Sequence, residues 1–239
     1  MEFYYIRHAQ STNNALYAET GSDAGRSEDP ELSPLGLEQA ERLAHFIKNN
    51  GLRPGFPGNQ KEGKQPELTH LYTSLMVRAV RTGSAIARAL DIPIQAIANA
   101  HECGGIFLDD PVTGEPCGKA GKSRSYFAEE FPNLALPEII GEDGWWNRPF
   151  EVEEDRLPRA HRFLGELLEK HGDTDDRVAV VSHGGFYNEV MTALMDLPKR
   201  NGVWFTLYNT AITRIDFIHG HTEVVYQNRT DFLPRTMVT

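Results

Sequence analysis

The feature that most constrains the fold of this chain is a repeated alternation of short apolar strands with amphipathic helical segments. Alternation of this kind is typical of a mostly parallel, doubly wound sheet covered by helices on both faces. The predicted strands are residues 2–6, 69–73, 92–97 and 177–182, and the predicted helices are 34–50, 77–90, 157–171 and 186–195. We therefore predict a three-layer α/β fold.

The first long helix carries clear signals at both of its ends. Ser33 is a suitable N-cap residue, Pro34 suits the first helical position, and Gly51 follows the last apolar position. These residue types favour helix initiation and termination, respectively. The helix is therefore expected to begin after Ser33 and to end before Gly51.

The C-terminal part of the chain changes character. Residues 203–208, 211–218 and 222–227 have the composition of strands, and a turn over 219–221 predicts a hairpin between the last two. We expect antiparallel strands to be added here to the parallel sheet. The chain is predicted to form one domain over 1–239, with insertions at about 53–68 and 104–150.

The second insertion is rich in glycine and proline, which predicts an irregular segment outside the core. It nevertheless contains many aromatic residues: Phe107, Tyr126, Phe127, Phe131, Trp145 and Trp146. We predict that it forms a cap over the functional pocket, with Trp145 and Trp146 as substrate-covering residues. The alternative is that these aromatic side chains pack against the sheet.

Composition limits the classes of partner and compartment. A formal net charge of −10 disfavours nucleic acid and anionic membranes as partners, because both select a basic surface. No apolar run approaches the ~18 residues of a membrane-spanning helix. The first residues do not resemble a signal peptide, and only two cysteines are present, so we expect a cytoplasmic protein. The sequence leaves open whether the chain forms a homodimer.

Polar residues follow several predicted strands, at the edge where ligands bind in open α/β sheets. Arg7 and His8 follow the first strand, and Ser74 and Arg78 follow the second. Further along come Glu102, and then His183 with Gly184 and Gly185. The sequence therefore brings arginine, histidine and carboxylate side chains toward one place.

These side-chain types suit a two-step phosphoryl transfer. Guanidinium groups bind phosphate oxygens in a bidentate manner and stay charged. A neutral imidazole can attack phosphorus and form a covalent intermediate. A carboxylic acid can protonate the leaving oxygen and later accept a proton from water.

Four short motifs contain these candidate residues. Residues 7–14 read RHAQSTNN, the segment from Thr73 reads TSLMVRAVRT, and further along come HECGGI and VVSHGGF. In these motifs the chain resembles the histidine phosphatase, or phosphoglycerate mutase-like, superfamily, whose signatures are R-H-G-x-[ST]-x-x-N and S-x-x-x-R-A-x-x-T, followed by an acidic residue and a second histidine. Weaker matches to the family begin at Leu32 and Tyr208.

The resemblance implies a role for each matching residue. His8 is the expected nucleophile, Arg7 and Arg78 bind the phosphoryl group, Glu102 donates and accepts the proton, and His183 stabilises the transferring group. The residues expected to bind phosphate or substrate are Ser11, Asn14 and Gly184. Ala9 replaces the usual glycine, so the backbone there must avoid a conformation that only glycine adopts.

The predicted function is hydrolysis of a small phosphorylated substrate, a phosphomonoester, through a phosphohistidine at His8. Two alternatives are a phosphoglycerate mutase-type phosphoryl transferase and a non-catalytic binding protein on the same fold. The segment after Asn14 lacks the N-x-F-x-G-W-x-D pattern of cofactor-dependent mutases, which favours hydrolysis. No metal-ligand spacing is recognisable, so the sequence assigns no metal and no cofactor.

Overall fold

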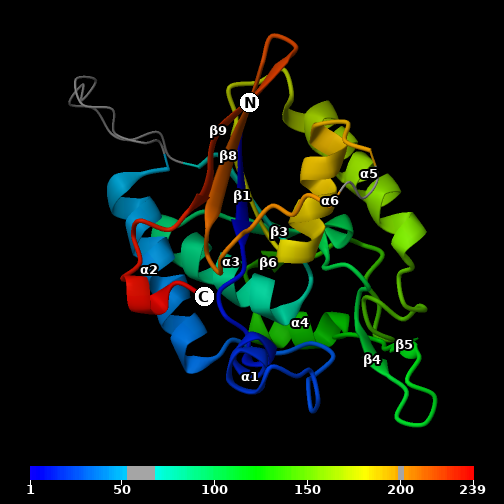
Figure 1. The fold of residues 1–239 in the computed structure, drawn as a ribbon. Coiled ribbons are helices and arrows are strands. Elements are labelled where there is room, and N and C mark those ends of the chain that lie inside the picture. Colours follow the sequence, from blue (N-terminus) through cyan, green and yellow to red (C-terminus); the bar gives the residue numbers. More distant parts are fainter. Residues whose placement is uncertain (53–67, 199–201) are drawn as a thin grey trace.

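The computed structural model describes residues 1–52, 68–198 and 202–239, and within these ranges one sheet organises the chain (Figure 1). The sheet has seven strands in the order β6-β3-β2-β7-β1-β8-β9. Their bounds are β1 Glu2–Arg7, β2 His70–Thr73, β3 Ile94–Ala96, β6 Leu134–Ala135, β7 Arg177–Ser182, β8 Ile212–Ile218 and β9 His221–Arg229. The first five of these run parallel, whereas β8 pairs antiparallel with both β1 and β9. The predicted fold class is confirmed.

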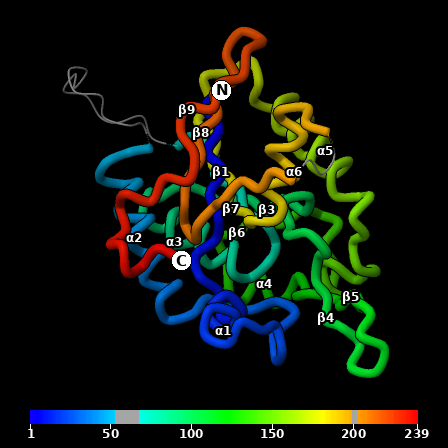
Figure 2. The backbone as a smooth tube through the Cα atoms, in the orientation of Figure 1, coloured from blue at the N-terminus to red at the C-terminus, as the bar shows by residue number. Residues whose placement is uncertain are grey.

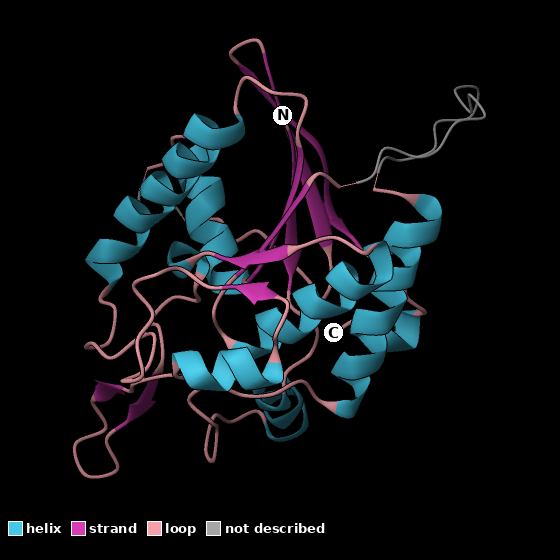
Figure 3. Ribbon diagram, turned by 180° about the vertical axis from the view of Figure 1, so that it is seen from behind, coloured by secondary structure: helices cyan, strands magenta, loops and turns pink. Residues whose placement is uncertain are grey.

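Helices cover both faces of this sheet (Figures 1 and 3). Helices α2 (Pro34–Asn50) and α3 (Val77–Leu90) pack on one face, and α5 (Glu153–His171) and α6 (Gly184–Leu194) pack on the other. Alternate residues of each strand enter opposite layers. In β1, Tyr4 and Ile6 join the core on one face and Phe3 and Tyr5 join the core on the other, as the twofold period of a strand requires.

Helix α2 has the ends that its sequence predicts. The Ser33 side chain accepts a hydrogen bond from the backbone N–H of Gly36, Pro34 opens the helix, and Gly51 follows it with φ of 68°. Helix α5, by contrast, begins at Glu153, before its predicted start at Leu157. Its first turn holds three acidic residues, which the positive end of the helix dipole favours.

One predicted strand is wrong. Residues 203–208 form no strand, because side chains rather than a neighbouring strand satisfy their backbone. The N–H of Phe205 donates to Asn188 Oδ1, and the N–H of Tyr208 donates to Asn228 Oδ1. The hairpin predicted around 219–221 is confirmed as β8 and β9.

The segment 104–150 contains more regular structure and more core than predicted. It holds β4 (Phe107–Asp109), β5 (Pro116–Gly118), α4 (Arg124–Glu130) and β6, which extends the main sheet. Strands β4 and β5 form a separate hairpin, drawn in green in Figure 2. The buried aromatic side chains of the segment 104–150 belong to the hydrophobic core between the sheet and the helices. The prediction from glycine and proline content, that this segment lies outside the core, is therefore wrong. The insertion predicted at 53–68 lies almost wholly outside the described residues.

None of the helices in the described ranges is both long and apolar enough to span a membrane.

Candidate active site

The predicted catalytic residues converge at the carboxyl ends of neighbouring parallel strands. Strand β1 leads into His8, β2 leads into Ser74, and β7 leads into His183. The backbone N–H groups of His8 and Ser74 donate to the carbonyls of Ser182 and Val181, each over 2.9 Å, which aligns the three strand ends. The imidazole rings of His8 and His183 lie 5.1 Å apart between centroids. The sheet register therefore builds the predicted cluster.

His8 is held as a neutral imidazole whose Nε2 is unprotonated. Its Nδ1 lies 2.7 Å from the carbonyl oxygen of Ala9, which can only accept, so Nδ1 carries the proton. Arg78 Nε donates to Nε2 over 3.2 Å. Burial, and then the charges of Arg78 and Arg7, hold the pKa of His8 well below its usual range. This is the protonation state that a nucleophilic histidine needs.

The backbone around His8 also meets the condition set by Ala9. Ala9 is not among the described residues with positive φ, so it needs no glycine-only conformation, as predicted. Its N–H donates to the Thr82 hydroxyl of α3 over 3.0 Å. The loop after β1, which contains His8 and Ala9, is thereby hydrogen-bonded to α3, the helix that carries Arg78.

Arg7 and Arg78 provide two buried positive charges beside the imidazoles. Arg7 Nη1 donates to the carbonyl of Leu207 over 2.6 Å, whereas its buried Nε has no hydrogen-bond partner within the described ranges. Burial lowers the pKa of both guanidinium groups, yet arginine remains charged in proteins. A buried donor without a partner is costly, and a phosphate oxygen would satisfy it.

His183 is oriented by Ser74. The Ser74 hydroxyl oxygen accepts from the N–H of Met76, so its own hydrogen is free to donate to His183 Nε2, 2.8 Å away. With Ser74 as the donor, the proton of the neutral imidazole is on Nδ1, which is buried and has no hydrogen-bond partner among the residues that the structure describes. Burial, with Arg78 and His8 nearby, lowers the pKa of His183 well below its usual range. His183 therefore offers a neutral N–H donor.

Glu102 lies at the N-terminus of α6, which follows His183. Its Oε1 accepts hydrogen bonds from the N–H groups of Cys103 and Phe186, both over 2.8 Å, and its Oε2 accepts from Gly185 over 3.1 Å. Three amides thus fix the carboxylate in the first turn of the helix, where the dipole favours a negative charge. The structure brings Glu102 to the predicted place, and its role in proton transfer stays a prediction.

The residues predicted to bind phosphate or substrate make contacts that stabilise the fold around the site. The Ser11 hydroxyl accepts from the N–H of Asn14, and the Asn14 amide oxygen accepts from the N–H of Ser11 in return. This reciprocal pair caps α1 (Thr12–Thr20), a helix that the sequence analysis did not predict. Gly184 opens α6, and a side chain there would lie 3.4 Å from Arg7 Nε. Their contacts with substrate stay predictions.

Asp29 is a member of this site that sequence reasoning missed. Its buried Oδ1 accepts from the N–H of Val77 and lies 3.8 Å from Arg78 Nη1, whereas its Oδ2 has no hydrogen-bond partner in the part of the chain that the structure describes. Burial raises the pKa of Asp29 to about 7, against the opposing effect of Arg78. Nothing in the local sequence distinguishes Asp29 from the exposed carboxylates beside it.

Trp145 and Trp146 pack in the interior. Their exposed fractions are only 8% and 4%, and both belong to the hydrophobic core that includes Ile106 and Phe127. The Trp146 ring covers Gly105, where an added Cβ would lie 2.1 Å from it. This packing supports the alternative role for the two indoles, because little of either ring remains for a substrate.

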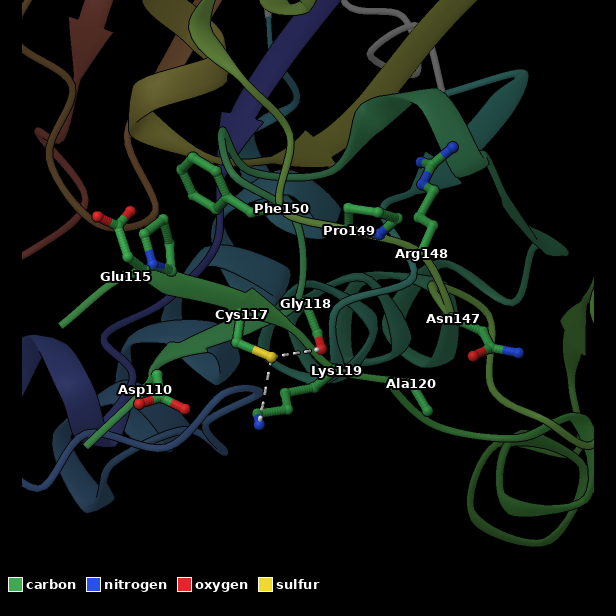
Figure 4. Close-up of a pocket in the computed structure, with 11 residues that line it drawn as sticks. Asp110, Glu115, Cys117, Gly118, Lys119, Ala120, Asn147, Arg148, Pro149 and Phe150 are labelled. Atoms are coloured by element: carbon green, nitrogen blue, oxygen red, sulfur yellow. Dashed lines mark hydrogen bonds between the residues drawn. The ribbon is translucent and has the colours of Figure 1, made fainter. Parts of the chain in front are cut away.

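A hollow of about 500 Å³ lies in the same segment (Figure 4). Its lining comes from residues 110–120 and 147–150 and includes the cations Lys119 and Arg148. The predicted catalytic residues are not in this lining. This hollow is therefore distinct from the candidate catalytic residues, which gather among buried side chains at the strand ends.

Residues 118–230 match the family model of the histidine phosphatase superfamily, branch 1. This match over the C-terminal part of the chain supports the superfamily resemblance that the motifs indicate. The matched range contains His183, whereas the roles of Arg7, His8, Arg78 and Glu102 rest on motif and geometry. The histidine phosphatase fold was the expectation from sequence, and it is confirmed.

Known proteins similar to this chain have names that state different reactions and substrates. A probable phosphoglycerate mutase, GpmB, from Yersinia pestis is 22% identical over 229 residues, which cover 91% of this chain and 85% of that protein. Phosphoserine phosphatase from Entamoeba histolytica, solved with 3-phosphoglyceric acid, aligns with a TM-score of 0.59 at 22% identity and covers 98% of this chain and 99% of the other. A putative alpha-ribazole-5'-P phosphatase from Escherichia coli aligns with a TM-score of 0.63 at 18% identity and covers 96% of each chain. At these identities the structural similarity establishes the fold.

Proposed function

We propose that this protein hydrolyses a small phosphomonoester through a phosphohistidine at His8. The observation that carries the proposal is the state of His8: buried, neutral, and with the Nε2 lone pair directed to Arg78. A binding protein without turnover would not need a nucleophile in this form. The presence of all five predicted catalytic side chains argues further for an enzyme.

In the first step, His8 Nε2 attacks phosphorus and the bond from phosphorus to the ester oxygen breaks. Arg78 exchanges its contact with Nε2 for one with a phosphate oxygen, and Arg7 Nε and His183 Nδ1 donate to the other oxygens. Preorganised donors of this kind stabilise the charge of the transferring group without reorganisation. Glu102, in its carboxylic acid form when the substrate is bound, donates its proton to the leaving oxygen and becomes the carboxylate that the three amides stabilise.

In the second step, water attacks the phosphohistidine and the bond between nitrogen and phosphorus breaks. Glu102 accepts the proton from water, and His8 returns to its neutral form with inorganic phosphate as the product. The two arginines provide the positive charge that a bound metal would otherwise contribute, so we propose turnover without a metal. Ser11, Asn14 and Gly184 are proposed to line the phosphate end of the pocket.

Phosphoryl transfer to a second hydroxyl of the substrate is the alternative reaction, and it is supported by the name of the Yersinia relative. Hydrolysis is favoured by the absence of the mutase pattern after Asn14 and by the phosphatase names of several structural neighbours. Those neighbours act, by name, on different phosphorylated small molecules. We propose a substrate of this general class, and one domain over 1–239 that carries the reaction.

The two free cysteines fit a reducing compartment, and we propose a cytoplasmic location. The acidic charge of the chain supports small molecules rather than nucleic acid or an anionic membrane as partners. A homodimer stays a proposal that the mass in solution would test.

The decisive experiment is to trap the intermediate. Enzyme mixed with a radiolabelled aryl phosphate and quenched within milliseconds should retain label that is stable in alkali and lost in acid, as for a bond between phosphorus and nitrogen. His8→Ala should retain none and should lose at least about 1000-fold in kcat. His161→Ala, on the exposed face of α5, is the matched control and should behave like the wild type.

Alkali-labile label, or turnover by His8→Ala at the wild-type rate, would exclude the mechanism. Hydrolysis and transfer are separated by the product formed from a substrate with a free second hydroxyl. A phosphatase releases inorganic phosphate, whereas a mutase yields the positional isomer.

A further inference from the structure

A group of two histidines and one aspartate lies at the end of the sheet opposite to the candidate active site. His70 is the first residue of β2, His171 is the last residue of α5, and Asp176 directly precedes β7. Each offers one ligand atom, and these three atoms lie within 4.8 Å of one another. It is the only such group of three among the residues that the structure describes.

The distances within this group fit a metal site that needs only a small closure. His171 Nδ1 lies 2.8 Å from Asp176 Oδ2, and His70 Nδ1 lies 3.7 Å from Asp176 Oδ1. Bonds of about 2.1 Å in tetrahedral geometry place two ligand atoms roughly 3.4 Å apart. The two separations involve different oxygens of Asp176 and lie on both sides of that value, so rotation of the Asp176 and His70 side chains has to bring the three ligand atoms to bonding distance.

The three side chains differ in how far they are exposed to solvent. The His171 side chain is 2% exposed and fixed, whereas those of Asp176 and His70 are 24% and 38% exposed. The two exposed side chains can adjust around the fixed imidazole. They also leave solvent access for an entering ion and for water as a further ligand.

The buried imidazole has the supporting contact that ligating histidines usually make. His171 Nε2 lies 3.0 Å from the Tyr72 hydroxyl oxygen, which in turn accepts from Lys170 Nζ over 2.6 Å. With a metal on Nδ1, the proton moves to Nε2 and is donated to Tyr72. Such a contact fixes the ring and its tautomer. Thr69 Oγ1, 2.9 Å from His70 Nδ1, would turn away on binding.

We propose that His70, His171 and Asp176 form a binding site for a divalent transition metal, with Zn²⁺ as the best match and water completing the coordination. Two imidazoles and one carboxylate are ligands that Zn²⁺ accepts readily. The ion joins β2, α5 and the start of β7, so it stabilises the fold. Since β7 has 6 residues at ~3.3 Å each, the ion lies about 20 Å from His183 and takes no part in phosphoryl transfer.

Titration calorimetry with ZnCl2 on chelator-treated, dialysed protein tests this proposal. The wild type should bind one Zn²⁺ per chain at this site, and His70→Ala and Asp176→Asn should each bind at least tenfold more weakly. His161→Ala removes an exposed histidine of α5 and should leave the affinity unchanged. His8→Ala should also keep the site, which excludes binding by the two catalytic imidazoles.

Stability and activity provide two further readouts. Zn²⁺ should raise the Tm of the wild type and of His161→Ala but not that of His70→Ala, because binding to the folded state alone stabilises it. Addition of EDTA should reverse the rise and leave kcat/KM for an aryl phosphate within about twofold.

The exposure of His70 makes its loss tolerable for folding, and circular dichroism checks this. No uptake of Zn²⁺ by the wild type, or equal affinity in wild type and His70→Ala, would overturn the site and leave an ordinary histidine–aspartate pair. Neither result bears on the phosphohistidine, which is trapped in a separate experiment.

Discussion

Two pairs of imidazoles occupy opposite ends of the same sheet, and their neighbours differ in charge. His8 and His183 lie beside two buried arginines, whereas His70 and His171 lie beside Asp176. The first environment keeps imidazoles neutral and attracts an anion. The second presents a negative charge to both rings and suits a cation. The charge of the flanking residues, rather than the histidines themselves, therefore decides what each pair can bind.

The largest expected effect concerns the positive charge at the catalytic end. Arg78→Ala should lower kcat/KM for an aryl phosphate by about 1000-fold, because it removes a preorganised donor to the transferring phosphoryl group. Arg81→Ala is the matched control on the same helix, three residues further on. Arg81 pairs with Glu31 and Glu130 at the surface, so its loss should change kcat/KM less than about twofold. Equal losses in both variants would mean that general charge, and not this site, carries the activity.

The next prediction separates the two ends by comparing His183→Ala with His171→Ala in the presence of EDTA. His183→Ala should lower kcat/KM by about 100-fold, whereas His171→Ala should leave it within about twofold. The order should reverse in urea unfolding. Both ring nitrogens of His171 have hydrogen-bond partners, whereas Nδ1 of His183 has none among residues 1–52, 68–198 and 202–239. His171→Ala should therefore be less stable by about 2 kcal/mol than His183→Ala. The same ranking in both assays would remove the distinction between the ends.

The smallest effect is a change of slope with pH. Because the pKa of Asp29 is about 7, its charge beside Arg78 appears as the pH rises through 7. We expect an inflection of about threefold in kcat/KM near that pH, and Asp29→Asn should abolish it. His8 should contribute no inflection above pH 6.5, since its folded pKa lies well below that value. A profile unchanged in Asp29→Asn would assign the inflection to another group.

The free energy of unfolding should also depend on pH, and the buried histidines and Asp29 should change it in opposite directions. The unfolded chain binds protons at His8 and His183 below pH 6.5 while the folded chain does not, so their contribution falls as the pH falls. The folded chain keeps a proton on Asp29 up to about pH 7, where the unfolded chain has lost it. Its contribution is therefore present at low pH and is lost as the pH rises through 7. Unfolding of Asp29→Asn across this range would isolate the histidine part.

Local sequence signals predicted the parts of the fold that depend on local physics. The caps of α2 and the bounds of α3 at 77–90 are confirmed because neighbouring residues fix them. The strand predicted at 177–182 is confirmed as β7, which pairs with β1 and β2. The strand expected at 203–208 is wrong, since strand formation needs a partner, and its backbone bonds to Asn188 and Asn228 instead. The segment 104–150, which is rich in glycine and proline, contributes to the core because its aromatic residues pack against a hydrophobic surface. That surface forms only in the folded chain and cannot be recognised in the sequence.

The meeting point of Arg7, His8, Arg78 and His183 could be predicted from the sequence, because each follows a strand or lies in the first turn of the helix after one, and parallel strands end at one edge. In contrast, the folded chain was needed to show that Asp29 faces Arg78, that the two tryptophans pack inside, and that three ligand atoms gather at the other edge. These contacts join segments far apart in the chain that carry no common motif. Their positions depend on the packing of whole helices against the sheet, which no short stretch of residues specifies.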